Sequence, residues 1–276
     1  MFRRTEYYNL PRKYRRRHDY CEFVINQIEE LIVDEKFIEL KAQEFKFPKE
    51  VMEGIQSSNE HIFDIFKELG LKNELNKAVR THLVLSLIME TCYFIQESLL
   101  CSLKMRMTVS FTLLRKPFLE ILILVMRILN ESDFIDKFNN LDGFDPLKTT
   151  PSEKKELLSK TNSLLFNNFD NDDLFDFIFN KEFGDSLFNL TNNAIHLYTD
   201  RNKISATEKQ NLNFIFSTQE NIDSMWDYIY TNLPMLLSFL AFSFDLLVFR
   251  STNLNENVFV ERHKLREKTR NKSRIK

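Results

Sequence analysis

The sequence predicts an all-α fold, a multi-helix bundle with long, kinked central helices. Gly occurs four times and Pro six times among 276 residues, whereas average usage would make Gly alone about 7% of a chain. Tight turns are therefore scarce, and no segment alternates apolar and polar residues as a strand does. Apolar residues instead recur at helical spacing. The length allows one elongated body or two lobes.

The first 70 residues are expected to form two helices. Residues 19–44 place apolar side chains at helical spacing with Glu and Lys between them, which is typical of an amphipathic helix. Pro48 suits the first turn of a second helix, and Gly70 is a C-cap residue that ends this helix at about Leu69.

Two long helices follow, one from about Asn73 to Lys104 and one over residues 107–130. The second is the most apolar helix of the chain and contains Pro117. Because the proline ring displaces the carbonyl of Leu113 and Pro has no N–H to donate, we expect a kink there.

A loop is expected at residues 141–151, which hold one Gly, two Pro and two Asp, the densest run of helix breakers in the chain. We interpret it as a hinge between two halves. The chain then divides into a basic N-terminal arm (1–17), an N-terminal helical half (18–140), the hinge (141–151), a C-terminal helical half (152–250) and a basic C-terminal tail (251–276).

Capping patterns predict where helices begin in the second half. The Ser/Thr-x-x-Glu pattern of a capping box occurs at Thr150/Glu153, Ser205/Glu208 and Ser217/Glu220. Residues 166–192 are rich in Phe, Asn and Asp and are expected to form short helices or loops. The last long helix runs from about Gln219 to Phe249, and Pro234 is expected to kink or split it.

The cysteines and the apolar segments indicate a compartment. Cys21, Cys92 and Cys101 are odd in number and lie in apolar helical stretches, which suits a reducing compartment, so we expect a cytoplasmic protein. Leu233–Phe249 is closest to a membrane span, with about 17 residues and only Asp245 charged. The polar remainder of the chain favours a core helix over an integral membrane span.

Several common chemistries are excluded by the sequence. The glycines lie at positions 54, 70, 143 and 184, too far apart for a dinucleotide fingerprint, a Walker loop or a G-x-S-x-G elbow. No Cys or His pair at short spacing suggests a zinc site, and no His follows a Glu by three positions as in di-iron bundles. We therefore expect no metal and no cofactor.

Charge is segregated along the chain, with basic ends and an acidic body. Residues 1–17 and 261–276 carry 15 Lys and Arg against three acids, which leaves 23 bases against 37 acids between them. Cations gathered on short ends favour polyanionic partners. Tyr residues stand among the N-terminal arginines, as suits contact with a nucleic-acid backbone and stacking on unpaired bases.

The basic ends supply the candidate nucleic-acid-binding residues. These are Arg12, Lys13, Arg15, Arg16, Arg17, Arg262, Lys264, Arg266, Lys268 and Arg270. Bases occupy every even position from Arg262 to Lys276, and we expect this tail to be disordered until it binds phosphates. Two alternatives stay open: the tail only improves solubility, or the acidic body itself binds the tail.

A first polar cluster is expected between two apolar helices. Arg115 and Glu120 lie within residues 107–130, where burial requires charged partners, and Glu90 and Glu97 share one face of the preceding helix. We expect these four side chains to form an ionic cluster. It either sets the helix register, which we favour, or forms a catalytic or ligand site.

A second polar cluster spans residues 192–202. In it, His196 could act as a general base near neutral pH, Arg201 could bind a phosphate, and Tyr198 or Asn193 could orient a substrate. The alternative, which we favour, is a loop whose Asn and Asp side chains cap helices, because one His without a paired nucleophile specifies no reaction.

The order of a long helix, then SFTLLRKPFLEI, then NNAIH resembles uncharacterised bacterial proteins of the HEPN-like helical class over about residues 80–250. That class includes toxins, abortive-infection proteins and RNases. The resemblance implies recurrent polar positions at Arg115, Glu120, Asn193 and His196. Members that cut RNA carry Arg, four to six residues, then His; here only Arg12 and His18 have that spacing, and His196 precedes Arg201.

These features favour a protein that binds nucleic acid, RNA in the first place, in a bacterial antiviral-defence or toxin–antitoxin setting. An enzymatic version would cleave RNA through His196 and Arg201, with a homodimer as one assembly. The alternative is a non-enzymatic scaffold or regulatory subunit whose basic tails dock on an acidic protein partner or an anionic membrane.

Overall fold

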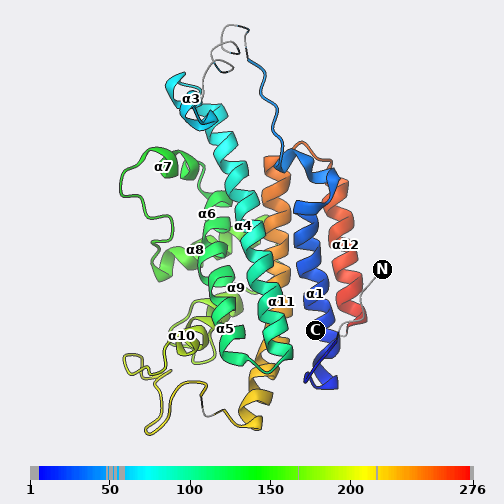
Figure 1. Cartoon of the computed structure of the whole chain (residues 1–276), viewed down its shortest axis with the longest axis vertical. Coiled ribbons are helices and arrows are strands. Elements are labelled where there is room, and N and C mark those ends of the chain that lie inside the picture. The colour runs from blue at the N-terminus through cyan, green and yellow to red at the C-terminus, as the bar shows by residue number, and fades with distance from the viewer. Residues whose placement is uncertain are drawn as a thin grey trace.

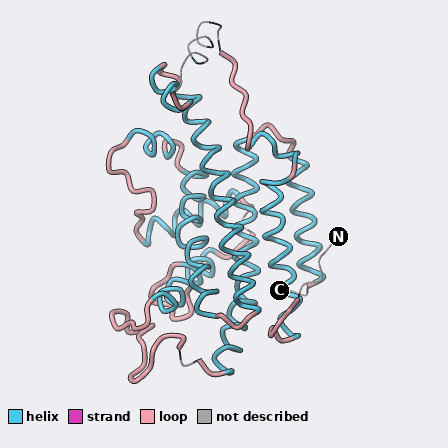
Figure 2. The backbone as a smooth tube through the Cα atoms, viewed as in Figure 1, coloured by secondary structure: helices cyan, strands magenta, loops and turns pink. Residues whose placement is uncertain are grey.

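Every regular element in the part of the chain that the structure describes is a helix, which confirms the all-α prediction (Figure 2). The computed structural model describes residues 6–47, 49, 52, 55, 60–166, 168–215 and 217–273. Most of the long helices run along the longest axis of an elongated molecule (Figure 1). The fold is therefore a multi-helix bundle.

Long and short helices occur on both sides of the 141–151 loop. The first half holds α1 (Arg12–Val33), η1 (Glu35–Leu40), α3 (Ile62–Glu68), α4 (Lys72–Leu103), α5 (Met107–Lys116), η2 (Pro117–Ile121), α6 (Leu122–Asn130) and α7 (Phe134–Asn140). The second half holds α8 (Pro151–Leu164), α9 (Asn171–Ile178), α10 (Leu187–Ile195), α11 (Gln219–Ser251) and α12 (Glu256–Lys272). The element η1 is a 3₁₀-helix and η2 is a π-helix.

Two long helices, α4 and α11, form the centre of the bundle. α4 packs against α1, α5 and α11, and α11 also packs against α1, α6 and α12. One apolar core includes side chains from both sides of the 141–151 loop. By length and composition alone, α4 and α11 could each cross a membrane, but 72% of the most apolar window of α11 is buried, which fits a core helix.

Pro117 is accommodated by a π-turn. The N–H of Leu122 donates to the carbonyl oxygen of Pro117, five residues back, so α5, η2 and α6 follow one another without a loop. The helix is thus disturbed at Pro117 as expected, and the disturbance is a widened turn. Pro234 lies inside the uninterrupted helix α11 and does not split it.

The predicted C-cap at Gly70 is confirmed. Gly70 has a φ of 67°, and the N–H groups of Gly70 and Leu71 donate to the carbonyl oxygens of Lys67 and Phe66 at 3.2 and 2.8 Å. These two bonds form a Schellman motif, which requires the left-handed backbone that Gly adopts without strain. Pro48, the expected start of this helix, lies outside the described residues.

The predicted capping box at the start of α8 is also confirmed. The side-chain oxygen of Thr150 accepts from the N–H of Glu153 at 3.2 Å, and the Glu153 carboxylate accepts from the N–H of Thr150 at 2.6 Å. Pro151 occupies the first helical position, where its missing N–H has no partner to lose. The local sequence therefore predicts correctly where this helix starts.

The pattern at Ser205 and Glu208 does not start a helix, and that prediction is wrong. The carbonyl oxygen of Ser205 accepts instead from the hydroxyl of Thr199 at 2.9 Å, inside a loop between α10 and α11. The helix expected from Ser217 begins one residue later, because Thr218 is the residue whose side chain caps α11. Short helices α9 and α10 lie within residues 166–195, close to expectation.

The first helix begins earlier than its apolar pattern indicates. α1 starts at Arg12 and ends at Val33, so residues 12–17 are its first turns and no separate arm. Tyr14 and His18 explain the early start, because both side chains are buried. The Tyr14 hydroxyl donates to the Asp227 carboxylate at 3.2 Å, and this hydrogen bond joins the basic first turns of α1 to α11.

The expected disorder of the C-terminal tail is wrong for residues 256–272, which form α12. This helix packs on α1 and α11. Asp245 of α11 provides the physical reason, because it is 5% exposed and forms ion pairs with Arg262 at 2.9 Å and with Arg266. An isolated buried carboxylate is costly, so the two arginines and Asp245 require one another.

Candidate functional site

The two basic ends of the chain lie at the same end of the bundle. α1 and α12 run in opposite directions (Figure 1), and Arg262 near the start of α12 donates to the carbonyl oxygen of Gln27 at 2.5 Å. Lys272 lies about 15 Å further along α12, and the same distance counted back from Gln27 leads to Arg17. The last turn of α12 therefore lies beside the first turns of α1.

We define the basic end as the exposed cations of these turns that form no ion pair with another described residue. They are Arg12, Lys13, Arg16, Lys268 and Lys272. Lys13 lies over the ring of Tyr14, with Nζ 4.6 Å from the centroid. The pKa of Lys13 is raised, first by its contact with the Tyr14 hydroxyl and further by the nearby Asp227 and Asp223. These two carboxylates mark the acidic border of the basic end.

Aromatic rings and further cations border the basic end. Arg15 lies over the ring of Tyr7 at 4.7 Å and donates to the carbonyl oxygen of Leu10. Tyr8 is 52% exposed, and Nζ of Lys104 lies 4.9 Å from its ring centroid. No sequence pattern points to Lys104, because only the fold brings the turn between α4 and α5 next to Tyr8.

Arg17 and the four remaining tail residues are engaged within the protein. Arg17 donates to the Thr231 hydroxyl at 3.1 Å. Arg262 and Arg266 are buried and paired with Asp245, and Arg262 also pairs with Glu30 at 2.9 Å, so their prediction as nucleic-acid-binding residues is corrected. The other two pair with acids of the same helix, Lys264 with Glu261 at 2.9 Å and Arg270 with Glu267 at 3.4 Å.

The ionic cluster expected at Glu90, Glu97, Arg115 and Glu120 does not form in the described structure. Glu90 pairs with Lys116 instead, and Glu97 is exposed. Arg115 donates to the Thr191 hydroxyl of α10 at 3.3 Å. Adjacent residues on a helix point about 100° apart, so Lys116 faces α4 while Arg115 faces α10.

The second polar cluster does gather around one cavity. His196, Tyr198 and Arg201 line an open cavity of about 830 Å³ beside α10. All three side chains are exposed, and the N–H of His196 caps α10 by donating to Asn192. Asn193 does not line this cavity, because its side-chain oxygen accepts from the Thr199 hydroxyl at 3.1 Å and so braces the loop.

Neither a metal site nor a comparison with known proteins assigns a function to the chain. Among the described residues, no group of three His, Cys, Asp or Glu side chains is placed to hold a metal ion. No family model, no curated protein and no solved structure matches the chain.

Proposed function

We propose that this protein binds nucleic acid at the basic end, with RNA as the preferred partner. The observation that carries the proposal is the antiparallel packing of α12 on α1, which brings the cations of both chain ends together. Five exposed cations without carboxylate partners among the described residues create a positive surface that attracts a phosphate backbone. Because the helices hold these cations in place, binding costs less conformational entropy than binding by free tails.

The aromatic border supports RNA over duplex DNA as the preferred partner. The half-exposed ring of Tyr8 lies beside Lys104, and both border the basic end. Unpaired bases stack on such rings while cations contact the backbone, and accessible unpaired bases are typical of RNA loops and ends.

A salt titration of RNA binding tests this proposal. Binding of a fluorescent single-stranded RNA is followed by anisotropy as salt rises, in the native protein and in Arg12→Gln/Arg16→Gln. Each lost phosphate contact should reduce the log–log slope by about 0.7, so the double variant should lose about 1.4. Lys160→Gln is the matched control, because Lys160 is exposed but pairs with Glu156 on α8. An unchanged slope in the double variant would overturn the proposal.

A catalytic extension rests on the cavity that His196 and Arg201 share. The loop that follows α10 and the start of α1 lie toward the same end of the molecule (Figure 1). In this version His196 takes the proton of a ribose 2′-hydroxyl, whose oxygen attacks the adjacent phosphorus. The bond to the 5′-oxygen breaks and water protonates that oxygen, which leaves a 2′,3′-cyclic phosphate and a 5′-hydroxyl. Arg201 stabilises the added negative charge.

Product analysis of RNA incubated with the protein tests the catalytic extension. His196→Ala and Arg201→Ala should each remove the cyclic-phosphate product while RNA binding persists. His82→Ala is the control, because His82 is an exposed histidine of α4. Equal RNA turnover in the native protein and the His196→Ala/Arg201→Ala variant would remove the catalytic role and leave the binding proposal intact.

The biological setting is proposed from the resemblance to HEPN-like proteins. A role in bacterial defence or in a toxin–antitoxin pair, exerted in the cytoplasm by a monomer or homodimer, predicts growth arrest when the protein is overproduced. Arrest should weaken in Arg12→Gln/Arg16→Gln. If overproduction is harmless and an acidic protein or anionic lipid outcompetes RNA at the basic end, the scaffold role replaces this one.

A further inference from the structure

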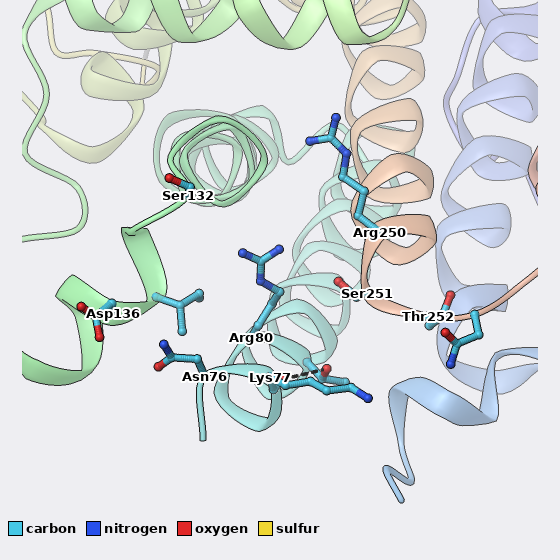
Figure 3. Close-up of a pocket in the computed structure, with 11 residues that line it drawn as sticks. Asn76, Lys77, Arg80, Ser132, Asp136, Arg250, Ser251 and Thr252 are labelled. Atoms are coloured by element: carbon cyan, nitrogen blue, oxygen red, sulfur yellow. Dashed lines mark hydrogen bonds between the residues drawn. The ribbon is translucent and has the colours of Figure 1, made fainter. Parts of the chain in front are cut away.

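A second positively charged site lies away from the basic end. A cavity of about 310 Å³ lies where the start of α4, the loop before α7 and the end of α11 meet. Its polar lining includes Asn76, Lys77, Arg80, Ser132, Arg250 and Thr252. The amino group of Lys77 extends away from the guanidinium groups of Arg80 and Arg250 (Figure 3). The start of α4 and the end of α11 are both at the opposite end of the long axis from the first turns of α1 (Figure 1).

Arg80 is the central residue of this cavity and has no counterion among the described residues. Its side chain is half-buried, and no hydrogen bond or ion pair joins it to another described residue. The one described carboxylate that lines the cavity, Asp136, pairs with Lys72 at 2.8 Å. Burial lowers the pKa of Arg80, and the positive charge of Arg250 lowers it further. The fold thus keeps an uncompensated guanidinium in place.

Arg250 supplies a second guanidinium from α11. One of its N–H groups donates to the carbonyl oxygen of Leu129 at 2.9 Å, which orients the side chain toward the end of α6. In Figure 3 the guanidinium groups of Arg80 and Arg250 extend toward the same side of the cavity, with Ser132 on the wall beyond Arg80. Two like charges therefore share a small polar space.

We propose that this cavity binds the phosphate group of a small molecule. A phosphate monoester carries nearly two negative charges at neutral pH, which matches two arginines, whereas one carboxylate would compensate only one of them. The guanidinium fork donates two parallel hydrogen bonds to such an oxyanion, and the hydroxyl of Ser132 at the wall supplies a further donor. The volume accommodates a phosphate with a small attached group.

Calorimetric titration at constant ionic strength tests the site with inorganic phosphate, AMP and phosphate-free adenosine. Phosphate and AMP should bind saturably and adenosine should not. Arg80→Met and Arg250→Met should each weaken AMP binding about ten- to hundredfold, as expected for the loss of a charge-assisted contact. Equal binding of AMP and adenosine, native affinity in Arg80→Met, or no saturable binding at millimolar phosphate would each overturn the proposal.

Two further measurements separate this site from a structural role and from the basic end. Arg80→Met removes no hydrogen bond to a described residue and relieves repulsion with Arg250, so its melting temperature without ligand should equal or exceed the native value. A lower value would mean that Arg80 stabilises the fold and would count against a ligand site. Arg12→Gln/Arg16→Gln should keep native phosphate affinity, because those two residues lie at the opposite end of the molecule from the cavity. Lost phosphate affinity in this double variant would place the bound phosphate at the basic end and overturn the assignment.

Discussion

Replacement of Asp245 by Asn tests how α12 is held on the bundle. Asp245, Arg262 and Arg266 are 5%, 5% and 1% exposed. In Asp245→Asn, Arg262 would keep its ion pair with Glu30, in which a guanidinium nitrogen lies 2.9 Å from a carboxylate oxygen. Arg266 has no second acidic partner among the described residues. Removing one member of a buried ion pair costs about 3–5 kcal/mol, because the other charge stays buried without compensation.

This cost should appear as local detachment of α12. Complete unfolding of a domain requires about 5–15 kcal/mol, whereas α12 lies near the chain end and packs on α1 and α11. Amide hydrogen exchange measures the detachment directly. In Asp245→Asn, protection of α12 should fall by about two to three and a half powers of ten, since about 1.4 kcal/mol corresponds to tenfold. Protection in the centre of α4 should change little.

A compensated variant serves as the control for this prediction. In Asp245→Leu/Arg262→Met/Arg266→Leu, all three buried charges are removed together, and apolar side chains of similar volume replace them. Its stability should equal or exceed that of the native protein. If Asp245→Asn keeps the protection of α12 within tenfold of the native value, the ion pairs do not hold this helix and the reasoning fails.

Three further predictions concern caps and thiols. Thr150→Ala should lower the free energy of unfolding by about 1 kcal/mol in urea titrations, because the capping box is lost. Gly70→Ala should cost about 1–2 kcal/mol, because φ is 67° there although no atom lies near the added Cβ. Burial raises the pKa of the Cys92 thiol to about 12, whereas the thiol of the unfolded chain ionises at about pH 8.5. The free energy of unfolding should therefore be undiminished below about pH 8.5 and should fall as the pH rises toward 12, which the midpoints of urea titrations measure.

The ends of α4 and α11 could be predicted to within two residues, because apolar periodicity and local end signals coincide there. The helix expected over 73–104 corresponds to α4 at 72–103, and the helix expected over 219–249 corresponds to α11 at 219–251. The same capping pattern fails at Ser205, where the following residues contain no amphipathic apolar run to pack. A cap satisfies the first N–H groups of a helix, but tertiary burial of an apolar face supplies most helix stability.

The candidate sites are harder to predict because they depend on contacts between distant segments. The sequence pattern pairs Glu90 with Arg115, but a shift of one residue gives Lys116 the contact and turns Arg115 toward Thr191. The ion pairs of Asp245 leave a sequence signal, since it is the only charge in residues 233–249 and a buried carboxylate needs a cation. That signal identifies the need for a partner and not the partner itself.

The alternating bases of the C-terminal tail illustrate how fold divides one charge pattern between two roles. Every second residue from Arg262 is basic, and on a helix this spacing splits into two series with period four. Arg262, Arg266 and Arg270 form the first series, whose first two members are buried. Lys264, Lys268 and Lys272 form the second and are exposed. Part of the positive charge that the sequence suggests for ligand binding is therefore used in ion pairs within the fold.

This division sets a measurable limit on RNA binding. If all 15 bases of the two ends contacted phosphates of a single strand, the log–log salt slope would approach about −10. The five residues of the basic end give about −3.5, and the four bases in residues 1–5 and 274–276, which lie outside the described structure, extend the limit to about −6.3. Arg15, Arg17, Lys264 and Arg270 are partly or fully exposed and would extend it further to about −9, so only a slope steeper than that would mean that α12 releases Arg262 and Arg266 on binding. In that case, Asp245→Asn should strengthen RNA binding rather than leave it unchanged, because it weakens the hold on Arg262 and Arg266.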